Sequence, residues 1–92
     1  MYTIKPRQKR AAKRLGVSIK PSTTANKKID VYKDDKKISS IGDINYNDYA
    51  IYLKSNGLKY ADNRKRLYKI RHDKTRKVVG SKSYYADQIL WT

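Results

Sequence analysis

The residues that could do acid–base chemistry lie in one strongly basic stretch, "ADNRKRLYKIRHDKTRK", which runs from Ala61 to Lys77. It contains the single histidine of the chain, His72, followed directly by Asp73. A serine nucleophile would need His72 as its general base in a defined pocket, and no motif in the sequence marks such a pocket. We therefore expect His72 either to join a cationic surface or to pack with its side chain hydrogen-bonded to the backbone.

Metal and nucleotide chemistry lack the side chains they need. Zinc sites use three or four nitrogen, sulfur or oxygen ligands, and this chain offers one histidine, no cysteine, no glutamate and scattered aspartates. A phosphate-cradling loop needs closely spaced glycines, whereas the four glycines here lie far apart, at Gly16, Gly42, Gly57 and Gly80. We expect no catalytic residue, no metal, no cofactor and no small-molecule substrate.

Positive charge is the dominant feature of the 92 residues, with 23 Lys and Arg against 8 Asp, a formal net charge of +15. Residues 1–28 carry nine Lys or Arg and no acid, and residues 64–78 carry eight with one Asp. Such charge destabilises a compact state by self-repulsion, so it favours a polyanionic partner, most commonly nucleic acid. A solvated, solubilising helix face is the alternative reading of the second block.

The predicted nucleic-acid-binding residues are the cations of these two blocks. Lys and Arg contacts to phosphates position a protein without reading sequence, so we expect binding that is largely sequence-independent. Of the two nucleic acids, we expect DNA rather than RNA, although phosphate contacts do not distinguish them. These residues are Lys5, Arg7, Lys9, Arg10, Lys13, Arg14, Arg64, Lys65, Arg66, Lys69, Arg71, Lys74, Arg76 and Lys77. The chain has no apolar run that could span a bilayer and no apolar segment behind its basic start, so we expect neither a membrane partner nor a secretory signal.

The patterns along the chain predict an α+β fold, in which a small domain over residues 27–92 follows a flexible basic arm over residues 1–26. The arm has too few apolar residues to bury a helix face, and residues 19–28 have the composition of a linker. Alternation over residues 29–32 and a second run from Ile38 predict a β-hairpin that turns at Asp34–Asp35. We expect this hairpin to pack on two or three helices.

Three helices follow in the prediction. Asn45 or Asn47 can cap the first, which ends at Asn56–Gly57. The basic segment then predicts one long helix with a single packing stripe, ending by Val79–Gly80, and Ser83 can cap a short C-terminal helix. The nine tyrosines could fill the core, anchor an interface or stack on bases, and their helical spacing favours the core.

Three segments, "KKIDVYKDDKKISSIGDINYNDYAIYL", "YADNRKRLYKIRH" and "GSKSYYADQILW", resemble a family of small basic proteins from nucleocytoplasmic large DNA viruses, the giant viruses of algae and amoebae. The resemblance covers Lys27 to Trp91 and depends on Ile41–Gly42, Asp48–Tyr49, Arg71–His72 and Tyr84–Trp91. The family has no assigned activity, so no catalytic residue is carried over. The resemblance implies a viral protein found in the virion, and in the host cytoplasm or nucleus during infection. It implies genome binding or packaging, or alternatively a minor capsid protein that grips acidic protein neighbours.

Overall fold

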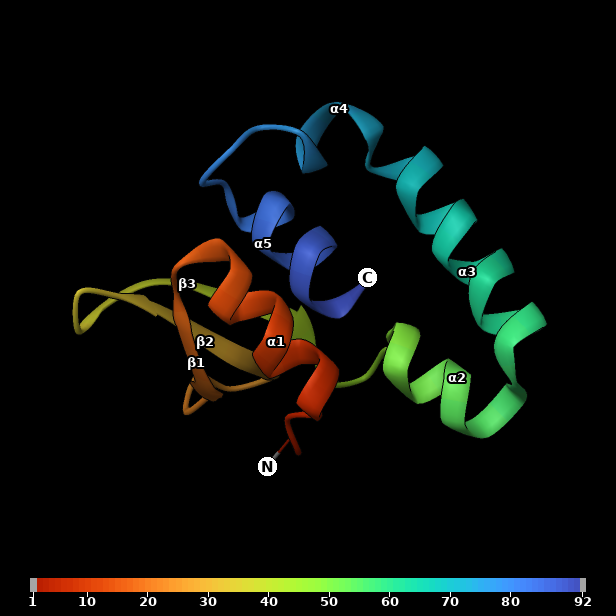
Figure 1. The fold of residues 1–92 in the computed structure, drawn as a ribbon, viewed down its shortest axis with the longest axis horizontal. Coiled ribbons are helices and arrows are strands. Elements are labelled where there is room, and N and C mark those ends of the chain that lie inside the picture. The colour runs from red at the N-terminus through yellow and green to blue at the C-terminus, as the bar shows by residue number, and fades with distance from the viewer. Residues whose placement is uncertain (1, 92) are drawn as a thin grey trace. The chain divides into compact units, whose positions relative to one another are not determined.

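The computed structural model describes residues 2–91, which divide into two compact units, Met1–Tyr46 and Asn47–Thr92. The N-terminal unit contains one helix and a three-stranded sheet, and the C-terminal unit contains four helices (Figure 1). The α+β class is therefore confirmed, with a third strand and more helices than the sequence predicted. Among residues 2–91, no helix combines the length and hydropathy needed to cross a membrane.

The sheet of the N-terminal unit is antiparallel, in the order β1 (Ser18–Pro21), β2 (Lys27–Lys33) and β3 (Lys36–Asp43). Its hairpin turns as predicted at Asp34 and Asp35, whose φ angles of 52° and 64° are both positive. Two successive left-handed residues give the turn the twist that matches the flanking strands, and aspartate tolerates this conformation better than most residues. Ile29 pairs with Ile41 across the hairpin, and both are fully buried.

The predicted flexible arm is wrong for the described residues 2–26, because this segment forms helix α1 (Pro6–Leu15) and strand β1. Helix α1 buries a narrow stripe made of Gln8, Ala11 and Ala12. Small and polar side chains contribute little to a hydropathy pattern, but they allow a helix to approach its neighbour closely. Gly16 ends the helix with a φ of 75°, a left-handed conformation that glycine adopts without a steric penalty.

Gln8 is fully buried, and the start of the chain satisfies both ends of its amide. Its Oε1 accepts a hydrogen bond from the backbone N–H of Lys5 at 2.8 Å, and its Nε2 donates to the hydroxyl of Tyr2 at 2.7 Å. A buried amide with its partners in place stabilises the fold, whereas an unpaired one would destabilise it. These bonds explain how a polar residue can serve as the centre of a buried face.

Asp30, on β2, is a second buried polar group of this unit. Its Oδ1 accepts hydrogen bonds from the hydroxyls of Ser22 at 2.6 Å and Ser40 at 2.7 Å. Burial alone would raise the pKa of Asp30, but these hydrogen bonds, with Lys37 nearby, hold the pKa below its usual value. The carboxylate is therefore ionised and links β2 to β3 and to the segment after β1.

The C-terminal unit begins with α2 (Tyr49–Asn56), which the sequence placed correctly but capped with the wrong residue. Asp48, not Asn45 or Asn47, is the N-cap, and its carboxylate accepts a hydrogen bond from the N–H of Ile51 at 3.1 Å. The predicted stop is confirmed, because α2 ends at Asn56 and Gly57 takes a φ of 87°. Helix α3 (Leu58–Arg71) starts immediately after it.

The single long helix predicted for the basic segment is wrong. Helix α3 ends at Arg71, His72 turns the chain with φ −106° and ψ 18°, and the one-turn helix α4 (Asp73–Arg76) follows. Helix α5 (Lys82–Leu90) closes the unit, and its cap is Ser81 rather than Ser83. The hydroxyl of Ser81 accepts a hydrogen bond from the N–H of Tyr84 at 3.1 Å.

Aromatic rings join the helices of the C-terminal unit. Trp91, just after α5, stacks on Tyr68 of α3 with centroids 4.6 Å apart and ring planes 9° apart. Its ring also lies 6.2 Å from that of Tyr52 on α2, which in turn contacts Tyr60 at 5.4 Å. Trp91 therefore packs back onto α2 and α3.

Candidate nucleic-acid interface

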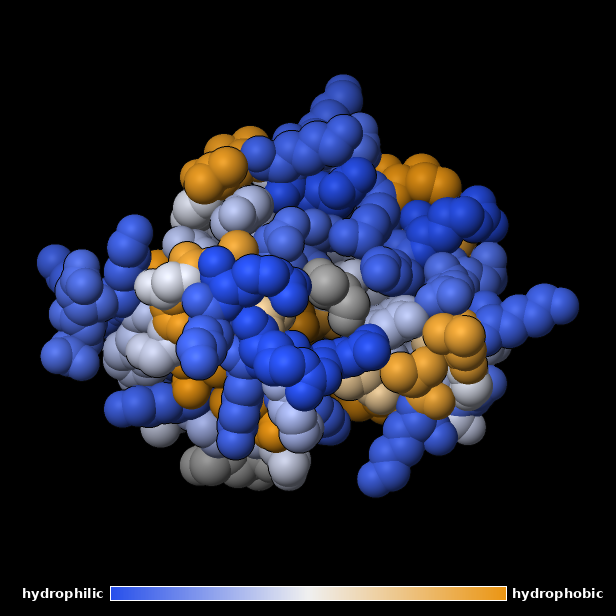
Figure 2. Space-filling model, viewed as in Figure 1, coloured by the Kyte–Doolittle hydropathy of each residue, from blue (hydrophilic) through white to orange (hydrophobic). Residues whose placement is uncertain are grey.

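The outer face of α1 is the most uniformly cationic surface of the N-terminal unit. The sequence of α1, PRQKRAAKRL, contains no acidic residue, and its buried stripe leaves the Lys and Arg side chains on the opposite face. Its exposed cations, which form no ion pair with any described residue, are Lys9, Arg10, Lys13 and Arg14. Figure 2 shows hydrophilic side chains crowded over this helix. This surface can present several positive charges to one extended anion.

The two predicted cations at the start of α1 are less available. Lys5 lies 4.4 Å from the ring centroid of Tyr2, and its Nζ donates a hydrogen bond to the carbonyl oxygen of Thr3 at 2.8 Å. Arg7 is half-buried and takes part in a further interaction. Both side chains are therefore partly committed to contacts within the protein, unlike the four cations further along α1.

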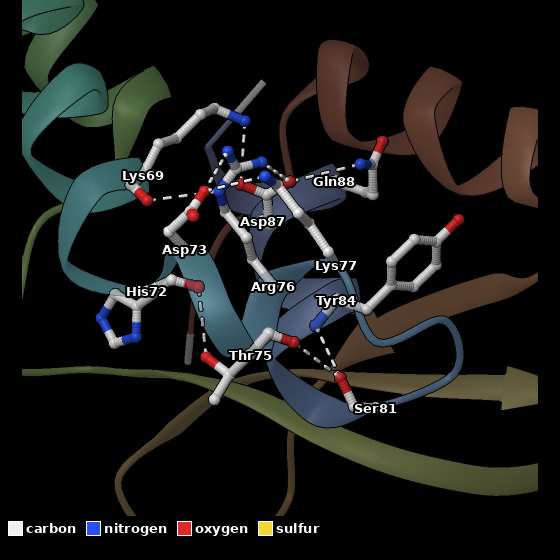
Figure 3. Close-up of polar contacts among 10 residues, drawn as sticks. All are labelled: Lys69, His72, Asp73, Thr75, Arg76, Lys77, Ser81, Tyr84, Asp87 and Gln88. Carbon is white, nitrogen blue, oxygen red and sulfur yellow. Dashed lines mark hydrogen bonds and ion pairs between the residues drawn. The ribbon is translucent and has the colours of Figure 1, made fainter.

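In the C-terminal unit, three of the predicted cations belong to an internal ion-pair network, called here the Asp87 network (Figure 3). Lys69 Nζ lies 2.8 Å from Asp87 Oδ1, and Arg76 Nη1 lies 4.0 Å from Asp87 Oδ2. Arg76 Nη2 also contacts Asp73 at 3.0 Å, and Lys77 Nζ contacts the same carboxylate at 3.1 Å. These pairs join α3, α4, α5 and the residue that follows α4.

Burial makes Asp87 the centre of this network, because its side chain is only 1% exposed whereas that of Asp73 is 54% exposed. An unpaired charge at the position of Asp87 would be strongly unfavourable, so Lys69 and Arg76 are needed by the fold. Arg76 is fixed further, since its Nε donates to the carbonyl oxygen of Lys69 at 3.2 Å. Lys69 and Arg76 therefore stabilise the fold, and an external anion would have to compete with Asp87 for them.

The pKa values of two groups in or beside this network, Tyr68 and Asp73, differ from their usual values. Burial, followed by the nearby charge of Asp87, raises the pKa of Tyr68 to about 12. A hydrogen bond and the charge of Lys77, with a smaller effect of Arg76, hold the pKa of Asp73 below its usual value. At neutral pH the phenol is therefore protonated and the carboxylate is charged.

Two further predicted cations lie against aromatic rings. The guanidinium of Arg64 is 5.5 Å from the ring centroid of Tyr52, and the ammonium of Lys65 is 5.0 Å from that of Tyr49. Such cation–π contacts attach the side chains to α2 and leave the outward part of each charge accessible. These two residues contribute to helix packing as well as to the positive potential of the unit.

The remaining cations of the second block, Arg66, Arg71 and Lys74, are exposed. Arg66 donates one hydrogen bond to Asn63 at 3.1 Å, and neither Arg71 nor Lys74 forms an ion pair with a described residue. One of the three, Arg66, lines a shallow depression of about 430 Å³ together with Lys69, Ile70, Asp73 and Arg76. The structure thus divides the predicted set into exposed cations and cations held by internal partners.

The side chain of His72 packs on an aromatic ring, without the hydrogen bond to a described backbone group that one of the two expectations included. Its ring packs on that of Tyr68 with centroids 4.4 Å apart, while its main-chain carbonyl oxygen accepts hydrogen bonds from the N–H groups of Thr75 and Arg76. The side chain itself makes no hydrogen bond to the backbone within residues 2–91. No group of three or more His or Asp side chains is arranged to hold a metal ion in that same range.

Asp87 forms ion pairs with two of the predicted cations, and the sequence analysis did not single it out. A signal was present, because Asp87 is the one acid among the aromatic and aliphatic residues of "YYADQILW". A lone carboxylate in such a segment faces burial and needs a cation from elsewhere in the chain. The identity of that cation could not be read from spacing, because Lys69 lies 18 residues away.

Comparison with known proteins adds no relative: no family model, curated protein or solved structure matches this chain. The resemblance to a family of giant-virus proteins therefore stays a prediction.

Proposed function

We propose that this chain is a non-catalytic protein that binds nucleic acid largely without regard to sequence. The observation that supports this proposal is the outer face of α1, where Lys9, Arg10, Lys13 and Arg14 are exposed and form no ion pair with described residues. Four such cations within about two turns of helix suit a row of phosphates. Binding to phosphates releases condensed counterions, which supplies affinity without base contacts.

The C-terminal unit adds further phosphate contacts in this proposal. Among the predicted cations of this unit, Arg66, Arg71 and Lys74 are exposed and have no acidic partner within the described residues, so they can approach an anion without first breaking an ion pair. Lys69 and Arg76 would have to leave or share Asp87, which makes them weaker candidates. The proposed interface is therefore smaller than the set predicted from sequence.

The resemblance described above supports a setting for this activity. Within that proposal the ligand is DNA rather than RNA, and the protein acts in genome binding or packaging in a virion. The same exposed cations could instead hold acidic neighbours in a capsid, so the test must separate nucleic acid from other polyanions.

The test is a salt-titrated binding measurement on duplex DNA, single-stranded DNA and heparin. A variant in which the four α1 cations become glutamine is compared with a control that removes four exposed lysines elsewhere. The first carries Lys9→Gln, Arg10→Gln, Lys13→Gln and Arg14→Gln, and the control carries Lys33→Gln, Lys36→Gln, Lys54→Gln and Lys59→Gln. Both variants have the same net charge, so only the position of the charge differs.

We expect the α1 variant to lower the steepness of log K against log salt by about 3 to 4 on duplex DNA, since each lost phosphate contact accounts for about 0.9. The control should keep most of the slope. Equal losses in the two variants would show that only net charge matters. Wild-type affinity that does not change between about 50 and 200 mM salt would overturn the proposal. Equal, weak binding to DNA and heparin would also overturn it and favour an acidic protein partner.

A further inference from the structure

Three aromatic rings of the C-terminal unit form a continuous stack. The ring of Tyr68 lies 4.6 Å from that of Trp91, at 9°, and 4.4 Å from that of His72, at 34°. Both distances are too short for contacts at the ring edge, so each neighbour covers a face of Tyr68. Among the described rings, His72 and Trp91 do not contact each other. They therefore cover opposite faces, and Tyr68 is the middle of the stack.

The two ends of this stack differ. At one end the ring of Tyr52 packs beside Trp91 at 6.2 Å, so the aromatic cluster continues into α2. At the other end no described ring follows His72, whose side chain is partly exposed. Figure 3 shows the imidazole directed away from the Asp87 network, and neither ring nitrogen makes a hydrogen bond within residues 2–91. The stack thus ends in a partly exposed ring that has unused polar atoms.

Two cations lie within two residues of this terminal ring in the sequence. Arg71 precedes His72 at the end of α3 and Lys74 follows it in α4, and both side chains are exposed. Neither forms an ion pair with a described residue. A partly exposed aromatic ring with exposed cations close to it in the sequence offers the two features that bind a nucleotide, namely a surface for the base and charges for the neighbouring phosphates.

We propose that His72 is a stacking site for an unpaired nucleobase, with Arg71 and Lys74 holding the phosphates on either side of it. A base inside a duplex is already stacked on its neighbours, so the ligand is a single strand or a frayed end. The base would extend the Trp91–Tyr68–His72 stack by one ring. The inference rests on the proposed function, because it adds a base contact to binding that otherwise depends on phosphates alone.

The test compares a thymidine single strand with an abasic strand of equal length and equal phosphate number, at the same salt concentration. Two substitutions of His72 are matched in bulk: His72→Leu removes the aromatic face and His72→Phe keeps one. We expect the wild type and His72→Phe to bind the base-bearing strand about 5- to 150-fold more tightly than the abasic strand, which is the range for stacking of one base. The His72→Leu variant should lose this preference, and all three proteins should bind the abasic strand equally.

Arg71→Gln serves as the charge control, since it should weaken binding to both strands by a similar factor. Fluorescence of Trp91, the single tryptophan of the chain, reports whether the stack on Tyr68 persists in each variant. Equal wild-type affinity for the two strands would overturn the stacking site while leaving the proposed function intact. A preference that survives in His72→Leu would overturn it too, by placing the base elsewhere. Failure of the wild type to bind either single strand would overturn the stacking site, and the measurement on duplex DNA described above would then decide the proposed function separately.

Discussion

Replacing Asp87 with asparagine should destabilise the C-terminal unit more than any other single charge removal there. Breaking a fully buried ion pair costs about 3–5 kcal/mol, because the remaining charge is left without a partner. Here Lys69 and Arg76 keep side-chain exposures of 27% and 21%, so water and Asp73 can stabilise them in part. We therefore expect a loss of about 2–3 kcal/mol for Asp87→Asn, which is below that range because the cations are only partly buried. A domain of this size then melts about 10–20 °C lower.

The assay is thermal unfolding followed by Trp91 fluorescence, with Asp73→Asn as the control. Asp73 is 54% exposed, so its removal should change the melting temperature little. A double-mutant cycle with Lys69→Met then isolates the pair, and the double variant should be more stable than the sum of the single losses implies. A melting temperature for Asp87→Asn equal to that of Asp73→Asn would refute the central role given to the buried carboxylate.

Three other predictions follow from particular groups. The pKa of Tyr68 rises from 10 to about 12, so its contribution to the free energy of unfolding is complete below pH 10 and disappears between pH 10 and 12. An absorbance titration of the tyrosines should show one phenol that ionises at higher pH than an ordinary tyrosine, and Asp87→Asn should lower the pKa of that phenol. The pKa of Asp30 is depressed, so the contribution of this carboxylate to the free energy of unfolding is complete above pH 3.8 and disappears as the pH falls through the lower pKa of the folded state. Ser40→Ala removes one hydrogen bond to the carboxylate, so it should raise the pKa of Asp30 in a carboxyl NMR titration. Gly57→Ala should cost about 1–3 kcal/mol in thermal melts, since φ is 87° and ψ 170° while no atom lies within 4 Å of the added Cβ; an unchanged melt would contradict this backbone explanation.

The parts of the fold that the sequence predicted correctly depend on neighbouring residues. Alternation along β2, the Asp34–Asp35 turn and the Gly57 stop are each determined within a few positions. Helix α1 was missed because its buried face consists of Gln8 and alanines, which a search for large apolar residues overlooks. Strand β1 was missed because Pro21 and its polar neighbours suggest a linker, yet proline is tolerated at the end of an edge strand.

The sequence predicted which cations could form the candidate interface, but it did not predict which of them are accessible to a ligand. The sequence identified which cations are available as candidates, yet it could not show that Lys69 and Arg76 face a buried carboxylate. That pairing depends on the chain reversing between α3 and α5, which no local pattern encodes. The break at His72 was missed for the same reason, because the residues around it are all compatible with a continuing helix.

The exposed borders of the sheet have a consequence for the behaviour of concentrated protein. Strands β1 and β3 are both edges, and an unguarded edge can recruit strands from other molecules. Strand β3 carries a bulge, because Val31 pairs with Ser39 but Tyr32 pairs with Lys37, which leaves Ile38 as an extra residue. Together with two lysines on β3 and Pro21 on β1, this irregularity discourages fibre-like growth. Such protection matters most when a bound polyanion cancels the repulsion between positively charged molecules, since solubility then depends on the shape of the edges rather than on charge.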